Sequence, residues 1–370
     1  MSRRPLQLPD FPWDSLAEAT RRAREHPDGL VDLSVGTPID GVAEVIQRAL
    51  SSVAEVPGYP ATWGTAGLRE AVVAAMARRH GVPGLNPDAV LPTIGSKELI
   101  AWLPTLLGLG AHDTVVVPEL AYPTYEVGAR LAGAQVLRAN GLTRLGPATS
   151  GSGRPALLFL NSPSNPTGAV LPVEHLRKVV DWARDRGTIV VSDECYLGLA
   201  WDAQPLSVLH PTVSGGNHTG LLAVHSLSKS SSLAGYRAGF VTGDPSLVAE
   251  LLEVRKHAGM IVPRPVQAAM IAALTDDAHT ELQRERYWER RARLLPAVKS
   301  AGFRVDHSVA GLYLWATRDE PCRDSVAWFA ERGILVAPGE FYGPTGAQHV
   351  RIALTATDER IGVAAARLQR

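Results

Sequence analysis

Residues 156–168 have the sequence ALLFLNSPSNPTG, an apolar run that is followed at once by a polar turn. The same arrangement occurs in residues 188–196, TIVVSDECY, and in residues 221–229, LLAVHSLSK. Apolar, β-branched runs of this length are typical of strands whose two faces are both covered by helices. Because ligands bind beyond the carboxyl ends of parallel strands, the polar residues after these runs are expected to form a site at one edge of a sheet.

The segments around these runs predict a doubly wound α/β fold. Another β-branched run covers Thr114–Pro118, and residues 172–186 place Val173, Leu176 and Val180 at helical spacing. A helix between two strand runs is the pattern of a crossover connection between parallel strands. We therefore expect a large, mostly parallel sheet with helices on both faces.

The C-terminal third has a different pattern and predicts a second, smaller domain. A long charged helix is expected over Pro265–Ser300, and hairpin-like runs follow at Gly311–Thr317 and His349–Leu354. A chain of 370 residues is also long for a single core. We expect three parts: an N-terminal segment (1–44) that joins a small α+β domain (266–370), and a large α/β domain (45–265).

Composition argues against several classes of function. The chain has 37 basic and 37 acidic residues without a long run of one sign, so we expect no nucleic-acid or membrane partner. The longest apolar stretch, Leu99–Leu109, is shorter than a bilayer span, and the N-terminus lacks a signal-peptide core, so we expect a cytoplasmic protein. Two cysteines, Cys195 and Cys322, and histidines without ligand spacing predict no disulfide framework and no metal site.

Four residues at the strand ends match the needs of pyridoxal phosphate chemistry. This cofactor requires a lysine that forms an imine with its aldehyde, an acid at its pyridine nitrogen, and donors to its phenolate oxygen. Lys229 is the expected imine lysine and the base that later moves the substrate proton, and Asp193 is expected at the ring nitrogen. Asn165 and Tyr196 are expected to donate to the phenolate oxygen.

Two further segments are expected to hold the cofactor phosphate. Ser226 lies three residues before Lys229 and Arg237 lies eight residues after it, so a hydroxyl and a guanidinium fork flank the lysine. Ser96 and Lys97 precede an apolar helical run, and the amides of a helix N-terminus favour an anion. We rank Lys97 below Ser96, because it is expected to contribute only its backbone amide.

Each of these residues alone also fits an ordinary structural role. A post-strand residue such as Asp193 is often a helix N-cap, and residues 165–168 have the sequence of a simple turn. A lysine such as Lys229 is most often a surface residue. Their combination at three neighbouring strand ends favours the cofactor site.

The combination resembles a known family. Residues 165–168 (NPTG), 193–196 (DECY), 226–229 (SLSK) and 235–239 (GYRAG) occur in the order and spacing of the class I/II aminotransferases of pyridoxal phosphate fold type I. The resemblance covers nearly the whole chain. It implies amino and oxo acid substrates, and a homodimer with shared active sites.

The resemblance implies four more positions. Tyr122 matches the aromatic residue that stacks on the pyridine ring, and Tyr59 matches the tyrosine that reaches the phosphate of the neighbouring subunit. Gly36 matches a glycine of the substrate-side loop, and Arg351 matches the arginine that binds the substrate α-carboxylate.

The substrate is suggested by three further segments. Residues 33–39 (LSVGTPI), 58–64 (GYPATWG) and 95–98 (GSKE) are similar to the actinobacterial succinyldiaminopimelate aminotransferases. This implies glutamate as the amino donor and N-succinyl-2-amino-6-oxopimelate as the acceptor, in lysine biosynthesis. Aspartate, LL-diaminopimelate and aromatic or kynurenine aminotransferases remain alternatives.

Other functions stay open at this point. The sequence Ser226-Leu-Ser-Lys229 also fits the S-x-x-K motif of serine acylases, but the further motifs of those enzymes do not follow it. A regulatory protein that keeps the cofactor fold would need a DNA-binding module as well. A β-lyase or a decarboxylase shares the same cofactor geometry, and Arg351 favours transamination only modestly.

Overall fold

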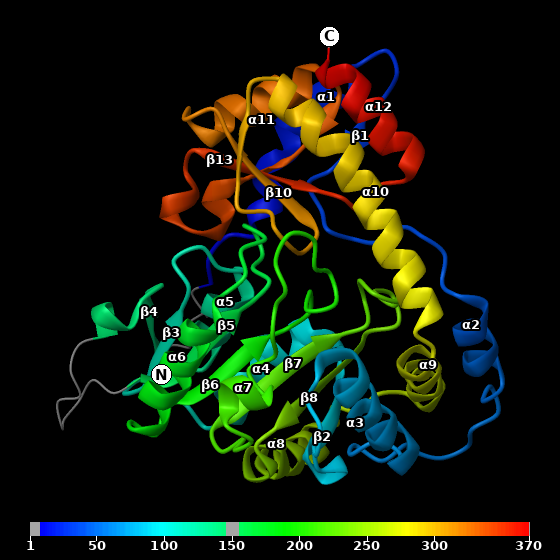
Figure 1. The fold of residues 1–370 in the computed structure, drawn as a ribbon, viewed down its shortest axis with the longest axis vertical. Helices are drawn as coiled ribbons and strands as arrows, with labels where there is room; N and C mark the ends of the chain where they lie inside the picture. The colour runs from blue at the N-terminus through cyan, green and yellow to red at the C-terminus, as the bar shows by residue number, and fades with distance from the viewer. Residues whose placement is uncertain (1–7, 146–154, 370) are drawn as a thin grey trace, which may run out of the picture.

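A seven-stranded sheet forms the larger part of the fold in this computed structural model, which describes residues 8–145 and 155–369. Its strand order is β2-β8-β7-β6-β5-β3-β4 (Figure 1). The strands are β2 (Val90–Ile94), β3 (Thr114–Val117), β4 (Gln135–Arg138), β5 (Pro155–Asn161), β6 (Ile189–Asp193), β7 (Leu221–Ser226) and β8 (Ala238–Gly243). Strands β3 to β7 run parallel, and β8 is antiparallel to both of its neighbours. The mixed α/β fold with a large, mostly parallel sheet is confirmed.

Helices cover both faces of this sheet. Alternate residues of a strand point to opposite faces, and here both sets of side chains are apolar. On β7, Leu221 and Ala223 belong to one buried cluster, and Leu222 and Val224 belong to another. The first cluster is completed by α3 (Ala66–His80), α6 (Val173–Arg184) and α9 (Arg264–Thr275). The second is completed by α4 (Gly95–Leu106), α5 (Thr124–Leu131) and α8 (Pro245–Ala258). Two shorter helices lie beside the first layer: α2 (Glu44–Ser51) and α7 (Pro211–Ser214).

A second, antiparallel sheet lies above the first in Figure 1. Its strand order is β12-β13-β10-β9, with β9 (Arg304–Asp306), β10 (Tyr313–Thr317), β12 (Ala337–Pro338) and β13 (His349–Ala353). The helices that share its buried cluster are α10 (Ala278–Ser300), α11 (Cys322–Glu331) and α12 (Asp358–Leu368). Short 3-10 helices complete the chain: η1 (Pro12–Leu16), η2 (Pro87–Ala89), η3 (Leu142–Leu145), η4 (Gly339–Tyr342) and η5 (Pro344–Gly346).

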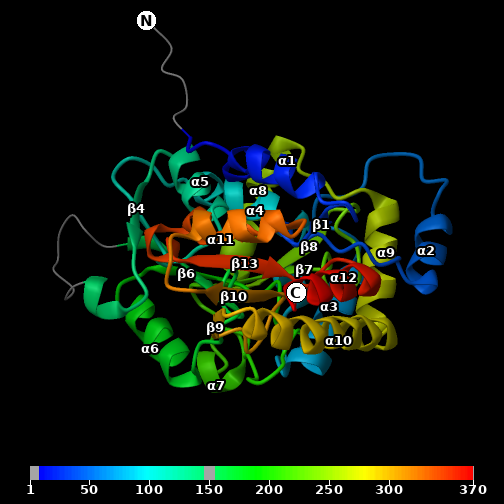
Figure 2. The same cartoon turned by 90° about the horizontal axis from the view of Figure 1, so that it is seen from above.

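The N-terminal segment packs with this C-terminal sheet. Strand β1 (Val31–Asp32) pairs in parallel with β11 (Ile334–Leu335), and α1 (Ala17–Arg24) packs on α11. In Figure 2, which shows the molecule from above, α1, α12 and β13 all lie in the layer that faces the viewer. The boundaries at residues 44/45 and 265/266 stay a prediction.

Two local expectations were wrong. The expected helix Pro265–Ser300 is broken between α9 and α10, where Asp276 has extended backbone and its carboxylate accepts from the His279 N–H (3.3 Å). Asp277 then binds Arg78 and Arg79 of α3. The hairpin-like runs do pair in antiparallel fashion as β10 and β13, but α11 lies between them in sequence, so they are not a hairpin.

Two features are absent from residues 8–145 and 155–369. No helix there has the length and apolar character needed to cross a bilayer. No group of three or more His, Cys, Asp or Glu side chains in these ranges is arranged to hold a metal ion.

Candidate active site

Three strand ends meet at one edge of the seven-stranded sheet. Asn161 of β5 lies opposite Asp193 of β6, and Asp193 lies opposite Val224 of β7. The Asn161 side-chain amide donates to the Asp193 carbonyl oxygen (3.0 Å). Its side-chain oxygen accepts from the backbone N–H of Asn165 (2.7 Å), which fixes the turn after β5. The three polar segments therefore lie side by side.

Asp193 is a buried carboxylate with neutral partners. The Tyr125 hydroxyl donates to its Oδ2 (2.8 Å), and the Cys195 backbone N–H donates to its Oδ1 (3.2 Å). Burial raises the pKa of Asp193, while these hydrogen bonds oppose the rise. A carboxylate in this position is stabilised by a cation beside it, which a protonated ring nitrogen would provide.

Lys229 follows β7 and its side chain lies among the other predicted residues. Burial lowers the pKa of its amine, and the positive charges of Arg351 and Arg237 add to the effect, although Tyr313 and Cys195 oppose it. The Tyr287 hydroxyl donates to the Lys229 carbonyl oxygen (3.1 Å), which anchors the backbone there. A lowered pKa leaves more of the amine neutral and nucleophilic near neutral pH.

The first turn of α4 and Arg237 form a cradle for an anion. Gly95 has a φ of +71°, and a Cβ atom built there would collide with Arg237 Nη2 and lie 2.7 Å from Arg237 Cζ. The guanidinium therefore lies directly over the N-terminal backbone of α4. Ser96 and Ser226 lie at the same place, and their Oγ atoms accept from Cys195 Sγ (3.2 Å) and from the Ser228 N–H (3.1 Å).

Arg351 provides a second positive group at the opposite end of the site. It is only 2% exposed, and it donates to the Asn165 side-chain oxygen (2.9 Å) and to the Ser34 carbonyl oxygen (2.6 Å). Its Nε has no hydrogen-bond partner among the described residues. Because Asn165 accepts through its oxygen, its amide nitrogen is left as a donor for a ligand.

The predicted aromatic residues line the space between these ends. Tyr122 is partly buried and packs edge-on to Tyr125, with ring centroids 5.9 Å apart. Burial raises the pKa of Tyr122, and Asp193 and Arg351 both act on it electrostatically. Tyr196 is buried, and its hydroxyl lies 2.9 Å from the hydroxyl of Tyr313.

Two predicted residues have exposed side chains outside this group of residues. A third, Gly36, contacts the group through its backbone. Tyr59 is 98% exposed. The Lys97 side chain is exposed as well, with its Nζ 5.8 Å from the Phe11 ring. Gly36 borders the site because Tyr313 packs directly against its backbone.

Sequence reasoning missed two buried tyrosines of the site. Tyr125 donates to Asp193 and stacks on Phe159 with centroids 4.8 Å apart, and Tyr313 contacts Tyr196 and Arg351. Tyr125 is three residues after Tyr122, so it lies in a segment that the sequence already marked. Tyr313 lies within the predicted strand run Gly311–Thr317, and its position there carried no signal beyond an aromatic residue in a strand.

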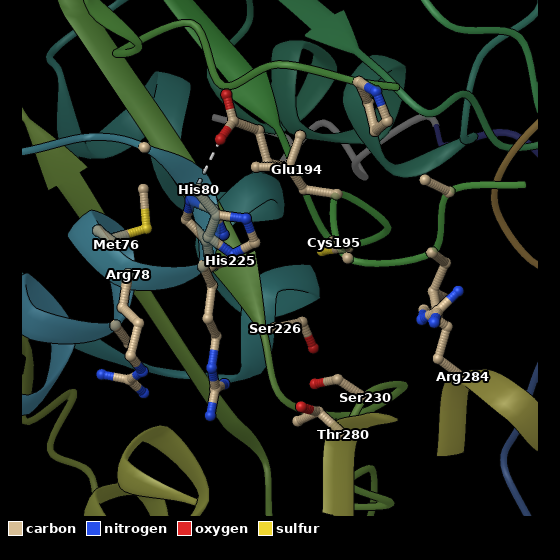
Figure 3. A pocket seen from close by; sticks show the side chains of 18 of the residues that line it. Met76, Arg78, His80, Glu194, Cys195, His225, Ser226, Ser230, Thr280 and Arg284 are labelled. Carbon is tan, nitrogen blue, oxygen red and sulfur yellow. Dashed lines mark ion pairs between the residues drawn. The ribbon is translucent and has the colours of Figure 1, made fainter. Parts of the chain in front are cut away.

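A pocket of about 760 Å³ adjoins the site on the α3 side of the sheet (Figure 3). Cys195 and Ser226 line it, but Lys229, Asp193 and Arg351 are not among its lining residues. It therefore lies beside the constellation and shares only one wall with it.

Comparison with known proteins assigns the family. The family model described as "Aminotransferase class I and II" matches residues 28–368. The chain belongs to the class I and II aminotransferases. This membership decides against the serine acylase alternative for Ser226 and Lys229.

Two curated relatives of this aminotransferase cover most of its length. "Probable aminotransferase Rv1178" of Mycobacterium tuberculosis is 73% identical over 98% of this chain and 85% of its own. "4-dedimethylamino-4-oxo-anhydrotetracycline transaminase OxyQ" of Streptomyces rimosus is 58% identical over 98% of this chain and 99% of its own.

A solved structure from Thermus thermophilus shares the fold. It is described as a "probable N-succinyldiaminopimelate aminotransferase", and it is 31% identical with a TM-score of 0.85 over 97% of this chain and 99% of its own. The match over both full lengths shows that the aminotransferase fold extends through both sheets.

Aminotransferases of this family depend on pyridoxal 5′-phosphate, and the residues present fit this cofactor. The cradle at Gly95 is a space that a side chain would fill, and Arg237 and two serines surround it. The buried Asp193 has neutral partners and suits a protonated ring nitrogen, and the Lys229 amine, whose pKa is lowered, suits an aldehyde.

Proposed function

We propose that this aminotransferase moves the amino group of glutamate to N-succinyl-2-amino-6-oxopimelate, with the site residues in their predicted roles. The observation that carries the reaction class is the position of the half-buried Lys229 amine at the end of β7, beside the end of β6 that holds Asp193, with its pKa lowered by burial. The substrate is the finer part of the proposal and rests on similarity.

The residues divide the work of the reaction. Bound pyridoxal phosphate supplies an aldehyde that takes up the amino group and a ring that withdraws electrons from the substrate α-carbon. Asp193 holds the ring nitrogen protonated, and Arg237 with Ser96 and Ser226 fixes the phosphate. Arg351 binds the substrate α-carboxylate and thereby orients its α-hydrogen.

Lys229 is then the acid and base of the proton transfer. Its Nζ removes the proton from the substrate α-carbon and delivers a proton to the cofactor carbon, and it reverses these steps in the second half-reaction. Asn165 and Tyr196 donate to the phenolate oxygen of the ring. Tyr122 packs on the ring face and excludes water from that side.

Support for the succinylated substrate comes from two sources. Residues 33–39, 58–64 and 95–98 resemble the actinobacterial succinyldiaminopimelate enzymes, and the 31% identical Thermus thermophilus structure carries that enzyme's name as probable. The first of these segments contains Gly36 and Ser34, and Ser34 accepts a hydrogen bond from Arg351. The segment therefore borders the arginine that is proposed to bind the substrate α-carboxylate.

A second candidate follows from the 58% identical Streptomyces rimosus transaminase. Its name describes an oxo-anhydrotetracycline as the amino acceptor, so a bulky polycyclic ketone is the competing substrate class. This identity is much higher than that of the Thermus thermophilus structure.

A half-reaction panel separates the candidates. The holoenzyme is mixed with single amino donors, and the loss of its visible absorbance band is followed. N-succinyl-LL-2,6-diaminopimelate should bleach the band at least ~100-fold more efficiently than aspartate, LL-diaminopimelate or aromatic amino acids. The proposal of the succinylated substrate fails if aspartate or an aromatic amino acid is preferred. The second half-reaction starts from the enzyme that carries the donor's amino group on its cofactor. If only an oxo-anhydrotetracycline acceptor removes the absorbance of this form, the second candidate is favoured.

Two further parts of the proposal concern the assembly and its location. Tyr59 is 98% exposed, which suits a side chain that completes the phosphate site of a second copy. We therefore include a homodimer with shared sites in the proposal. A cytoplasmic location is the matching expectation for an enzyme of amino-acid biosynthesis.

A further inference from the structure

Tyr313 occupies the centre of the site, although no predicted role falls on it. It is 3% exposed, and it begins strand β10 of the smaller sheet. Its hydroxyl lies 2.9 Å from that of Tyr196, and its ring lies 4.1 Å from the guanidinium carbon of Arg351. It also acts electrostatically on Lys229. Tyr313 therefore contacts both the cofactor end and the carboxylate end of the site.

The two tyrosine hydroxyls constrain each other's protons. A phenolic hydroxyl has one proton to donate, and in this buried pair either oxygen could be the donor. If Tyr196 donates to the cofactor ring oxygen, it has no proton left for Tyr313. The hydrogen bond between them then requires Tyr313 to donate to Tyr196.

The backbone of Gly36 keeps the Tyr313 hydroxyl in this place. A Cβ atom at Gly36 would collide with the Tyr313 hydroxyl oxygen and lie 2.9 Å from its Cζ. Strand pairing fixes the other side, because Tyr313 lies opposite Ala353 of β13. The hydroxyl is therefore held between the loop of Gly36 and Tyr196, with little freedom to move away.

We propose that Tyr313 is a positioning residue, whose hydroxyl donates to Tyr196 and so directs the Tyr196 proton toward the cofactor ring oxygen. This inference rests on the proposed role of Tyr196. The ring of Tyr313 has a separate task, because it packs on Arg351 and supports the carboxylate-binding geometry. Loss of the hydroxyl and loss of the ring therefore have different consequences.

The test is a pH titration of the visible absorbance band of the holoenzyme. Donation to the ring oxygen stabilises the anionic form, so weaker donation raises the pKa of the band. Tyr196→Phe should raise it by about 1 unit, and Tyr313→Phe by roughly half as much, because the second bond acts by polarising the first. Circular dichroism and cofactor content confirm that each variant is folded and loaded.

Tyr342→Phe is the matched control. Tyr342 is also fully buried and lies 5.0 Å from the Arg351 guanidinium carbon, but its hydroxyl has no hydrogen-bond partner in the described part of the chain. Its removal should leave the pKa of the band at the wild-type value. If Tyr196→Phe shifts the titration and Tyr313→Phe does not, the inference is wrong while the role of Tyr196 stands. If Tyr196→Phe shifts nothing, the proposed role and the inference fail together.

A second variant keeps the inference testable if Tyr313→Phe does not fold. Gly36→Ala should displace the Tyr313 hydroxyl and raise the pKa of the band in the same direction. Where Tyr313→Phe does fold, Gly36→Ala in that background should add little to the pKa shift, and a fully additive shift would contradict the inference. Kinetics give an independent readout: Tyr313→Phe should lower kcat roughly three- to tenfold with KM nearly unchanged, whereas Tyr313→Leu should raise KM as well.

Discussion

A single glycine leaves space beside Arg237 for the proposed anion site. Gly95 and Gly108 both have a φ of +71°, so alanine at either position is strained by a similar amount, about 1–2 kcal/mol. They differ in their neighbours, because a Cβ at Gly95 meets Arg237, whereas a Cβ at Gly108 meets no atom of the described residues within 4 Å. Comparing alanine at Gly95 with alanine at Gly108 therefore separates the effect of backbone strain from the effect of displacing Arg237.

Gly95→Ala should therefore weaken cofactor binding by at least ~10-fold, because the methyl group displaces the Arg237 guanidinium. Gly108→Ala should bind the cofactor like the wild type, with a similar loss of stability. Titration of both apoproteins with pyridoxal phosphate measures the difference. Equal affinities in the two variants would contradict the cradle.

Two stacked histidines, His80 (half-buried) and His225 (buried), predict a pH dependence of stability. His80, the last residue of α3, stacks on His225 with centroids 5.6 Å apart, and Glu194 lies 3.2 Å from His225 (Figure 3). Burial, followed by the charges of His225 and Arg79, lowers the pKa of His80 to about 3. In the unfolded chain this imidazole titrates near its ordinary value of about 6.5, so the unfolded state binds the proton first.

Stability should consequently fall as the pH drops below about 6.5, by on the order of 3 kcal/mol between pH 7 and pH 4 from His80 alone. His80→Gln should flatten this dependence, while His257→Gln, at an exposed histidine, should not. Urea denaturation at several pH values gives the free energies of unfolding. An equal slope in wild type and His80→Gln would show that His80 is not held neutral.

At the residue scale the sequence predicted the chemical groups but not their supports. Lys229, Asp193 and Arg237 carry motif spacing, so their roles could be proposed without a structure. Tyr125 contacts Asp193 and Tyr313 contacts Tyr196, at separations of 68 and 117 residues along the chain. Such long-range contacts follow from sheet register, which the spacing of residues along one chain does not reveal.

Three elements are joined by one buried arginine. Arg290 of α10 is 3% exposed and pairs with Asp40, between β1 and α2, and with Asp358 at the start of α12, both at 2.6 Å. Removing one carboxylate leaves a buried guanidinium short of a partner, which is the costly half of a buried ion pair.

Asp40→Asn should destabilise the protein by about 2–4 kcal/mol, measured as a lower urea midpoint. Asp319→Asn is the control, because Asp319 pairs with Arg304 in an exposed ion pair (2.7 Å). Exposed pairs contribute little, so the control should unfold within error of the wild type. Similar losses in the two variants would mean that the Arg290 cluster does not link the elements.

The predicted secondary structure agrees with the fold where apolar runs are long. It is wrong where contacts made by side chains end a helix. The apolar runs of residues 114–118, 156–160, 188–192 and 221–226 predict four strands of the large sheet, and these agree with β3, β5, β6 and β7 to within one residue at each end. The break at Asp276 and Asp277 was missed because the residues on both sides are good helix formers. The break depends on Arg78 and Arg79, which are distant in sequence.

At the scale of the whole molecule, residues from both sheets form the site. In the proposed homodimer, a residue of the second copy completes it. Asp193 and Lys229 come from the large sheet, and Tyr313 and Arg351 come from the small one. Family and fold could be predicted from the chain alone, because the motifs at the strand ends are specific. The substrate could not, since side-chain pockets depend on loops that no motif marks.

Subunit complementation tests the shared site. Tyr59→Ala and Lys229→Ala should each have little or no activity alone. Coexpression should restore about a quarter of the wild-type sites, because half of the randomly mixed dimers hold one intact site of two. Activity measured on the purified mixture gives the result, and no recovery would argue against a tyrosine shared between subunits.

The central claim is that Lys229 holds the cofactor. The chain has five lysines: Lys97, Lys178, Lys229, Lys256 and Lys299. Borohydride reduction of the holoenzyme fixes the cofactor on the lysine that binds it, and mass spectrometry of the peptides identifies that residue. The label should lie on Lys229 and be lost in Lys229→Ala, although that variant still binds the cofactor through its phosphate. A label on any other lysine, or a catalytically active Lys229→Ala variant, would contradict the account.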